Sequence, residues 1–368
     1  MAAGDATDDP RGAPAASPGR VRQRFEQWSA NPKCEANVLS AVGNVRMDRV
    51  AKRLHVPPSA GQSPFAISAG NTFEATILRD GAQRLRQALQ AAGVLATEAA
   101  RFVDFRTRDK GGPQKDPDAA EAATMAWIRE LVAGRARAED LLVAGATITV
   151  PDAAMLPRTR LGLDVVLAQR PAGGAAAAPW RLVVGEVKSY VDRGGYTDRA
   201  KLAGARAQAG VYVAGLRGAL ASLGVRPDQV TVETTGFLVV VRPGGRYPVV
   251  FAGEDFGAQA QRAEDGFARM RAIARTQPKL GDEGIDAVAA AARSFVPACV
   301  SFCDLAPRCQ VDAYAKGEPR VLGEDMAKFV GAVDLHRAYA ILEGAQPVTA
   351  PEADLARRIA ALEALRQR

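Results

Sequence analysis

The stretch RLVVGEVKSY, residues 181–190, places two opposite charges inside an apolar, β-branched segment. Such a segment is typical of a buried strand, and burying a charge is costly unless it is paired or bound. Side chains alternate between the two faces of a strand, so Glu186 and Lys188 point the same way, together with Leu182 and Val184. The stretch therefore predicts a sheet strand that carries a charged site.

Other strand-like and helix-like segments surround this stretch. Strands are predicted at 146–150, 160–169, 180–188, 234–243 and 246–251, with a hairpin connection of low complexity at 170–179. Apolar residues at helical spacing predict helices over 65–93, with Glu74 near the helix start, over a segment ending near Gly134, and over 197–220. This order predicts an α/β core with a mixed central sheet flanked by helices.

Two carboxylates and a lysine indicate cation chemistry at this sheet. Asp164 lies in the strand before Glu186, and the predicted hairpin brings the two side chains together, where they repel unless a cation lies between them. Mg²⁺ and Mn²⁺ prefer oxygen ligands, so Asp164, Glu186 and the carbonyl of Val187 predict a metal site. Lys188 would hold the attacking water or hydroxide beside a transferring phosphoryl group. The alternative is an ordinary, partly buried charge network at the end of a sheet.

The next predicted helix carries Gln208 and Tyr212, which are four residues apart and so share one face. A glutamine with a tyrosine hydroxyl can grip a phosphate or orient Lys188. A core tyrosine beside a solvated glutamine is the alternative.

These motifs together resemble the RecB-like branch of the PD-(D/E)XK nucleases. Asp164 after Gly-Leu, the Glu186-Val187-Lys188 run and the Gln-Tyr helix carry the resemblance. It implies a restriction-endonuclease-like core, a metal held by Asp164, Glu186 and Val187, and catalytic roles for Asp164, Glu186, Lys188, Gln208 and Tyr212. The branch has a Gly-x-x-x-His element on an earlier helix. Here Gly70 matches and Glu74 replaces the histidine, which implies a carboxylate ligand and leaves Mg²⁺ or Mn²⁺ open.

The chain has four cysteines: Cys34 near the start, and Cys299, Cys303 and Cys309 late in the sequence. In a reducing compartment such cysteines are better candidates for metal ligation than for disulfides. One cysteine before the core and three after it resemble the iron-staple nucleases, which include CRISPR-associated iron-sulfur exonucleases and AddB-type subunits. The resemblance implies a 4Fe-4S cluster on these four residues and a helical cap stapled by it, although the late spacing is Cys-x3-Cys-x5-Cys rather than the usual Cys-x2-Cys-x5-Cys. Zinc and unligated core cysteines are the alternatives.

Composition bounds the remaining expectations. With 368 residues, 48% of them apolar, the chain is long enough for a sizeable core, and its net charge of +7 favours an anionic partner such as nucleic acid. The richness in Arg and Ala is also typical of a GC-rich genome. We expect a disordered segment over 1–20, a nuclease domain over 21–310 and a helical extension over 311–368. With neither an apolar run long enough to span a membrane nor a secretory signal, the sequence predicts a cytoplasmic protein that makes no membrane contact.

The sequence thus predicts a metal-dependent DNA nuclease that acts on single-stranded DNA or on DNA ends and contains a structural iron-sulfur cluster. No P-loop motif is present in the sequence, so a helicase or defence-system partner would be a separate chain. The alternatives are a non-catalytic nucleic-acid-binding scaffold with the same fold and a zinc-stapled globular protein without a nucleic-acid role.

Overall fold

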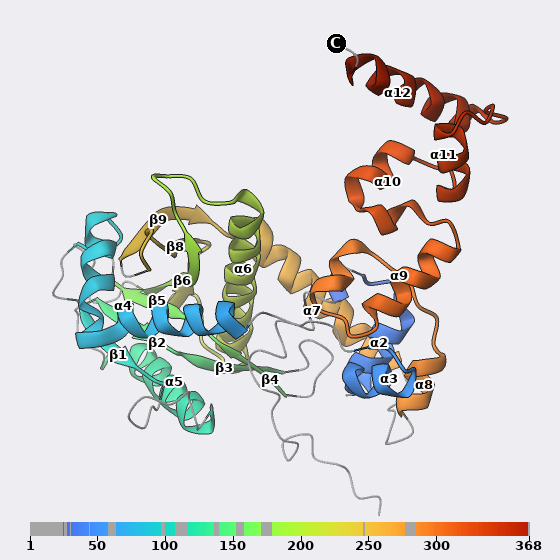
Figure 1. The fold of residues 1–368 in the computed structure, drawn as a ribbon. Coiled ribbons are helices and arrows are strands. Elements are labelled where there is room, and N and C mark those ends of the chain that lie inside the picture. The colour runs from blue at the N-terminus through green and yellow to red at the C-terminus, as the bar shows by residue number, and fades with distance from the viewer. Residues whose placement is uncertain are drawn as a thin grey trace, which may run out of the picture. The chain divides into compact units, whose positions relative to one another are not determined.

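The computed structural model describes residues 25, 28–29, 31–43, 45–57, 64–96, 100–106, 117–135, 140–151, 158–170, 179–245, 247–276 and 284–366 (Figure 1). Two compact units are present, one containing residues 63–275 and the other residues 23–62 and 276–368. The predicted disordered segment, 1–20, lies outside the described residues, and the predicted nuclease domain, 21–310, draws on both units. In the part of the chain that is described, no helix combines the length and apolar character needed to cross a bilayer.

A mixed seven-stranded sheet forms the centre of the first unit, which confirms the predicted α/β class. Strand β6 is parallel to β7 and β8 and antiparallel to β5, while β1 is parallel to β2. The pairs β2–β5 and β8–β9 are antiparallel. The sheet order is β1 (Arg101–Asp104), β2 (Leu141–Ala144), β5 (Val165–Gln169), β6 (Trp180–Val191), β8 (Thr235–Val241) and β9 (Pro248–Asp255), with β7 (Val230–Val232) also on β6.

Helices cover both faces of this sheet. Val183 and Val187 of β6 pack against the apolar cluster that α4 (Pro64–Ala91) forms with the sheet, whereas Lys188 contacts α6 (Arg199–Ser222). Because side chains alternate along a strand, α4 and α6 lie on opposite faces. The first unit also contains α5 (Pro117–Val132) and most of α7 (Gly257–Thr276).

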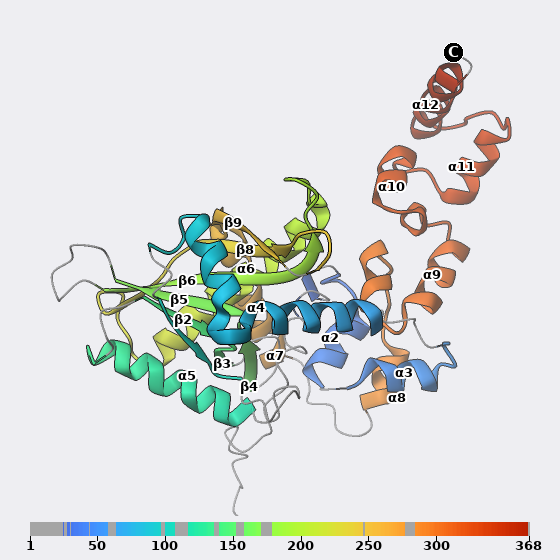
Figure 2. The ribbon, with the colours of Figure 1, turned by 60° about the vertical axis from the view of Figure 1, so that its left-hand side comes forward.

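Helix α4 changes direction part of the way along, as Figure 2 shows. The backbone leaves helical geometry at Arg79–Ala82, where Asp80 and Ala82 have positive φ angles of 53° and 59°. Glu74 lies ten residues into the segment before this kink. The expectation that Glu74 is near a helix start was therefore wrong, because the helix already begins at Pro64.

The predicted strand 160–169 is divided by a corner. β4 (Arg158–Gly162) pairs with β3 (Thr147–Pro151) in a separate two-stranded sheet, and the chain enters the main sheet only at Val165. Two main-chain hydrogen bonds close the corner, from the N–H of Gly145 to the carbonyl of Asp164 at 3.2 Å and from Leu163 to Ala146 at 2.8 Å. Asp164 is thus placed at the end of β5, beside β6.

The second unit brings the early and late parts of the chain into one apolar core. Val50 and Val56 share this core with Val288 and Phe295. The N–H of Ala36 also donates to the carbonyl of Ala292 at 3.2 Å. The elements are α2 (Glu35–Val42), α3 (Met47–Arg53), α8 (Gly284–Ala290), the 3-10 helices η3 (Pro297–Ser301) and η4 (Pro319–Leu322), α9 (Ala306–Ala315), α10 (Glu324–Val330), α11 (Leu335–Leu342) and α12 (Ala350–Arg366).

Candidate functional site

The charged pair on β6 lies as the strand pattern predicted. Glu186 is fully buried, with 0% of its surface exposed, and the ammonium of Lys188 forms an ion pair with its carboxylate. The side chain of Lys188 is 19% exposed. The lysine therefore stabilises a buried negative charge while still being reachable from solvent.

Gln208 and Tyr212 of α6 are connected to Lys188 by a chain of hydrogen bonds. Lys188 donates a hydrogen bond of 2.8 Å to Oε1 of Gln208, and Nε2 of Gln208 donates to the hydroxyl of Tyr212. Both residues are only 4% exposed, so they are covered by the protein. This geometry favours orientation of Lys188, one of the two roles considered from the sequence, over direct contact with a nucleic-acid strand.

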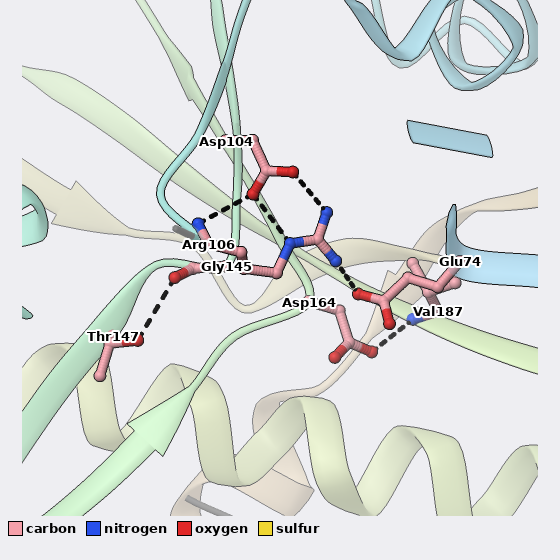
Figure 3. Close-up of polar contacts among 7 residues, drawn as sticks. All are labelled: Glu74, Asp104, Arg106, Gly145, Thr147, Asp164 and Val187. Atoms are coloured by element: carbon pink, nitrogen blue, oxygen red, sulfur yellow. Dashed lines mark hydrogen bonds and ion pairs between the residues drawn. The ribbon is translucent and has the colours of Figure 1, made fainter. Parts of the chain in front are cut away.

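Asp164 lies beside Glu186, as the predicted hairpin required. The β5–β6 register pairs Val165 with Gly185, so the next position along β6 comes opposite Asp164. The carboxylate of Asp164 accepts a hydrogen bond of 2.9 Å from the N–H of Val187 (Figure 3). A residue in an extended strand projects its N–H and its carbonyl to the same edge. The carbonyl of Val187 is therefore directed to the edge at which Asp164 lies.

Glu74 is held by an arginine that the sequence did not single out. Figure 3 shows the guanidinium of Arg106 between Glu74, with which it forms an ion pair, and Asp104, which it contacts through Nε and Nη2 at 2.8 Å each. The side chain of Arg106 is 8% exposed. Burial lowers the pKa of Arg106, but the hydrogen bond to Asp104 and the charges of Glu74, Asp104 and Asp164 raise it above the ordinary value. Arg106 is therefore a permanent cation within this acidic group.

Gly145 makes room for the stem of Arg106. A Cβ atom on Gly145 would lie 2.2 Å from Cγ of Arg106, and the φ angle of +66° is itself one that favours glycine. The hydroxyl of Thr147 donates to the carbonyl of Gly145 at 3.3 Å (Figure 3). Neither the corner nor this close approach is marked by a local pattern in the sequence, so no sequence signal indicated Arg106.

The charges of the site fit a divalent cation. Four carboxylates, from Glu74, Asp104, Asp164 and Glu186, face two cations, which leaves a formal charge of −2. All the donor atoms are oxygens, the ligands that Mg²⁺ and Mn²⁺ prefer. Among the residues described, however, no three or more His, Cys, Asp or Glu side chains are gathered so that they could hold a metal ion. Binding therefore requires carboxylates to turn from their present ion-pair partners.

The four cysteines gather in the core of the second unit. Cys34 precedes α2, Cys299 lies in η3, Cys303 follows η3, and Cys309 lies in α9. All four line one cavity, and the side-chain amide of Asn31 donates to the sulfur of Cys299 at 3.5 Å. The structure thus places the cysteine at the start of the chain in the same apolar cluster as the three late ones. Among the described residues, these side chains are not gathered closely enough to hold a metal ion as they stand.

The chemistry of these thiols fits a bound cation. Burial, with a smaller contribution from the neighbouring cysteines, raises the pKa of Cys303 to about 12. Burial likewise raises the pKa of Cys309 to about 11, although the charge of Arg293 opposes the rise. The thiols of Cys303 and Cys309 are therefore neutral when no positive centre is present, and a metal or cluster would stabilise their thiolates.

Comparisons with protein-family models, with curated proteins and with solved structures found no match to this chain.

Proposed function

We propose that this chain is a metal-dependent DNA nuclease with a PD-(D/E)XK-type site. The observation that carries the proposal is the position of Lys188, which lies between the fully buried Glu186 and the buried amide of Gln208. Asp164 reaches the same strand at Val187. A structural salt bridge accounts for the Glu186–Lys188 contact alone, and the contacts of Gln208 and Asp164 support a hydrolytic site.

Some residues of the site would bind the metal, and Lys188 would position the attacking water. Glu74, Asp164, Glu186 and the carbonyl of Val187 would hold Mg²⁺ or Mn²⁺. When bound, such an ion lowers the pKa of water and stabilises charge on the scissile phosphate. Lys188 would orient the attacking water and offset the negative charge that develops on the phosphate oxygens.

The second unit would supply the structural cofactor. Cys34, Cys299, Cys303 and Cys309 would bind a 4Fe-4S cluster, with zinc as the second candidate. Such a cross-link between the early and late segments restricts the unfolded chain and so stabilises the folded one. We also propose that the core is restriction-endonuclease-like, because of the arrangement of Asp164, Glu186 and Lys188. The cysteine site would staple the helical cap.

The substrates we propose are single-stranded DNA or DNA ends. We propose that the protein acts in the cytoplasm and that a separate helicase or defence-system protein is its partner. The formal charge of +7 favours association with the phosphate backbone, and such binding weakens as salt concentration rises.

The test compares the wild type with Lys188→Ala on 5′- and 3′-labelled single-stranded and duplex DNA, with Mg²⁺, Mn²⁺ or EDTA. Lys201→Ala is the matched control, because Lys201 lies on α6 and stacks over Tyr190 at 5.7 Å rather than facing Glu186. We expect cleavage by the wild type and by the control only when metal is present, and none by Lys188→Ala. Cleavage that persists in EDTA and in Lys188→Ala would contradict the proposal.

A non-catalytic nucleic-acid-binding scaffold is the second candidate. The ion pairs Glu186–Lys188 and Glu74–Arg106 favour it, because each neutralises a carboxylate without any metal. Binding of single-stranded DNA without cleavage in any divalent ion, by protein whose cysteine site is loaded, would support the scaffold.

A further inference from the structure

Arg106 takes part in the acidic group without belonging to any motif of the sequence. Its guanidinium holds Glu74 on one side and Asp104 on the other, and its charge also acts on Asp164 (Figure 3). We propose that Arg106 is a positioning residue that sets the cation affinity of the site: it holds Glu74 while no divalent ion is bound and releases Glu74 when one binds. The inference rests on the metal site of the proposed function.

Asp104 allows Arg106 to stay in place when Glu74 leaves. It accepts two hydrogen bonds of 2.8 Å from the guanidinium and a third, of 2.9 Å, from the main-chain N–H of Arg106. Charge-assisted, two-point contacts of this kind are among the stronger side-chain interactions. Arg106 therefore has one firm partner, Asp104, and one partner that it can lose, Glu74.

Arg106 is also packed against the corner that carries Asp164. Its stem passes over Gly145, where a Cβ atom would overlap Cγ, and the N–H of Gly145 donates to the main-chain carbonyl of Asp164. The guanidinium is consequently confined and cannot swing far from the carboxylates. Its position can affect both Glu74 on α4 and Asp164 on the β4–β5 corner.

The charges predict opposite effects for two substitutions. Removing the charge of Arg106 changes the formal charge of the group from −2 to −3 and releases Glu74, so cations should bind more tightly. Removing the charge of Asp104 changes it to −1 and leaves Arg106 with Glu74 as its main partner, so cations should bind more weakly. A purely structural role for the Arg106–Asp104 pair would not produce changes of opposite sign.

The experiment measures Mn²⁺ binding to the full chain by electron paramagnetic resonance and by calorimetry, without DNA. We expect Arg106→Gln to lower the Kd for Mn²⁺ about tenfold and Asp104→Asn to raise it about tenfold, within the usual range of coupling between sites. Arg101→Gln is the matched control, since Arg101 is exposed on β1, the strand that precedes Arg106, and its substitution removes one positive charge outside the group. Its Kd should stay within about twofold of the wild type.

A second variant protects the test against misfolding. Arg106→Met keeps an apolar stem over Gly145 and removes only the charged end, so it should tighten Mn²⁺ binding as Arg106→Gln does, and circular dichroism shows whether each variant is folded. Equal Mn²⁺ affinity in the wild type and folded Arg106→Gln, or weaker affinity in the variant, overturns the inference. If Arg106→Gln instead raises only the KM for DNA, Arg106 binds substrate phosphate and the inference also fails.

Metal binding and cleavage are measured separately, so the two proposals can fail separately. Tighter Mn²⁺ binding by Arg106→Gln in a protein that cuts no DNA would support the role of Arg106 and contradict the nuclease. Metal-dependent cleavage by the wild type, with equal Mn²⁺ affinity in the wild type and Arg106→Gln, would support the nuclease and contradict the role of Arg106.

Discussion

The ammonium of Lys188 lies 2.8 Å from Oε1 of Gln208, and Nε2 of Gln208 donates to the hydroxyl of Tyr212. All three side chains come from β6 and α6, two regular elements that contact each other directly. A lysine whose ammonium is already fixed by such a hydrogen bond would lose little conformational freedom on orienting a substrate. The amide of Gln208 is thus a positioning group for Lys188.

Gln208→Leu should lower kcat about tenfold or more with little change in KM, because Lys188 loses the partner that orients it while Gln208, being buried, makes no contact with the proposed DNA substrate. Tyr212→Phe should have a smaller effect on kcat, since it removes only the contact behind Gln208. Steady-state cleavage assays give both constants. Exposed Gln261 on α7 offers the control Gln261→Ala, and equal losses in kcat for Gln261→Ala and Gln208→Leu would contradict a positioning role.

Asp164 has two separable roles, as a hydrogen-bond acceptor and as a negative charge. Asp164→Asn keeps an oxygen that can accept from the N–H of Val187, whereas Asp164→Ala leaves that N–H without its present partner. Asn should therefore preserve the free energy of unfolding, and Ala should lower it by about 1 kcal/mol. Both variants should lose metal-dependent cleavage. Urea unfolding and cleavage assays on the same preparations check this, and full activity in Asp164→Asn would show that the charge is not required.

Two glycines of α6 should respond in opposite ways to alanine. A Cβ atom on Gly210 would lie 2.4 Å from Cβ of Gln259 and 2.6 Å from its main-chain carbon, so Gly210→Ala forces α6 away from α7 and should cost about 1–3 kcal/mol. Gly204 has no atom within 4 Å of the same position, and Gly204→Ala should stabilise the helix by about 0.5–1 kcal/mol. Urea unfolding of both variants measures the difference. Similar stabilities would show that the α6–α7 approach is not tight.

Local periodicity explains which parts of this fold could be predicted. Alternation along β6 gave the common direction of Glu186 and Lys188, and the four-residue spacing placed Gln208 next to Tyr212 on α6. Strands β1 and β2 were missed because each has only four residues, which is too short for a period to be read.

The contact between Arg106 and Glu74 could not be predicted because it joins α4 to the segment after β1, and no local pattern carries such tertiary information. The corner at Asp164 was missed for a related reason. Residues 160–169 have the pattern of one strand in the sequence, and only the pairing of β3 with β4 divides it.

The cysteine cavity predicts a common response from residues that are far apart in the chain. If Cys34 and Cys309 line one cavity that binds the proposed cluster, Cys34→Ser and Cys309→Ser should each abolish iron-sulfur absorbance and lower the unfolding temperature of the second unit, because the same cluster would hold both thiolates. Val300→Ala is the matched control, since Val300 lies between Cys299 and Cys303 and is 57% exposed. Anaerobic purification with iron and zinc analysis, followed by thermal unfolding, tests the expectation.

A bound cation should also make the second unit sensitive to chelators. Without it, the raised pKa values of Cys303 and Cys309 keep these two thiols neutral. The apolar cluster around Phe295 and Val288 then still joins the early and late segments, but the additional cross-link through the sulfurs is lost. Chelator treatment should therefore lower the unfolding temperature of the wild type and leave Cys34→Ser unchanged. If the purified protein contains neither iron nor zinc and unfolds at the same temperature as Cys34→Ser, the cysteines are core residues, and the apolar cluster alone holds the two segments together.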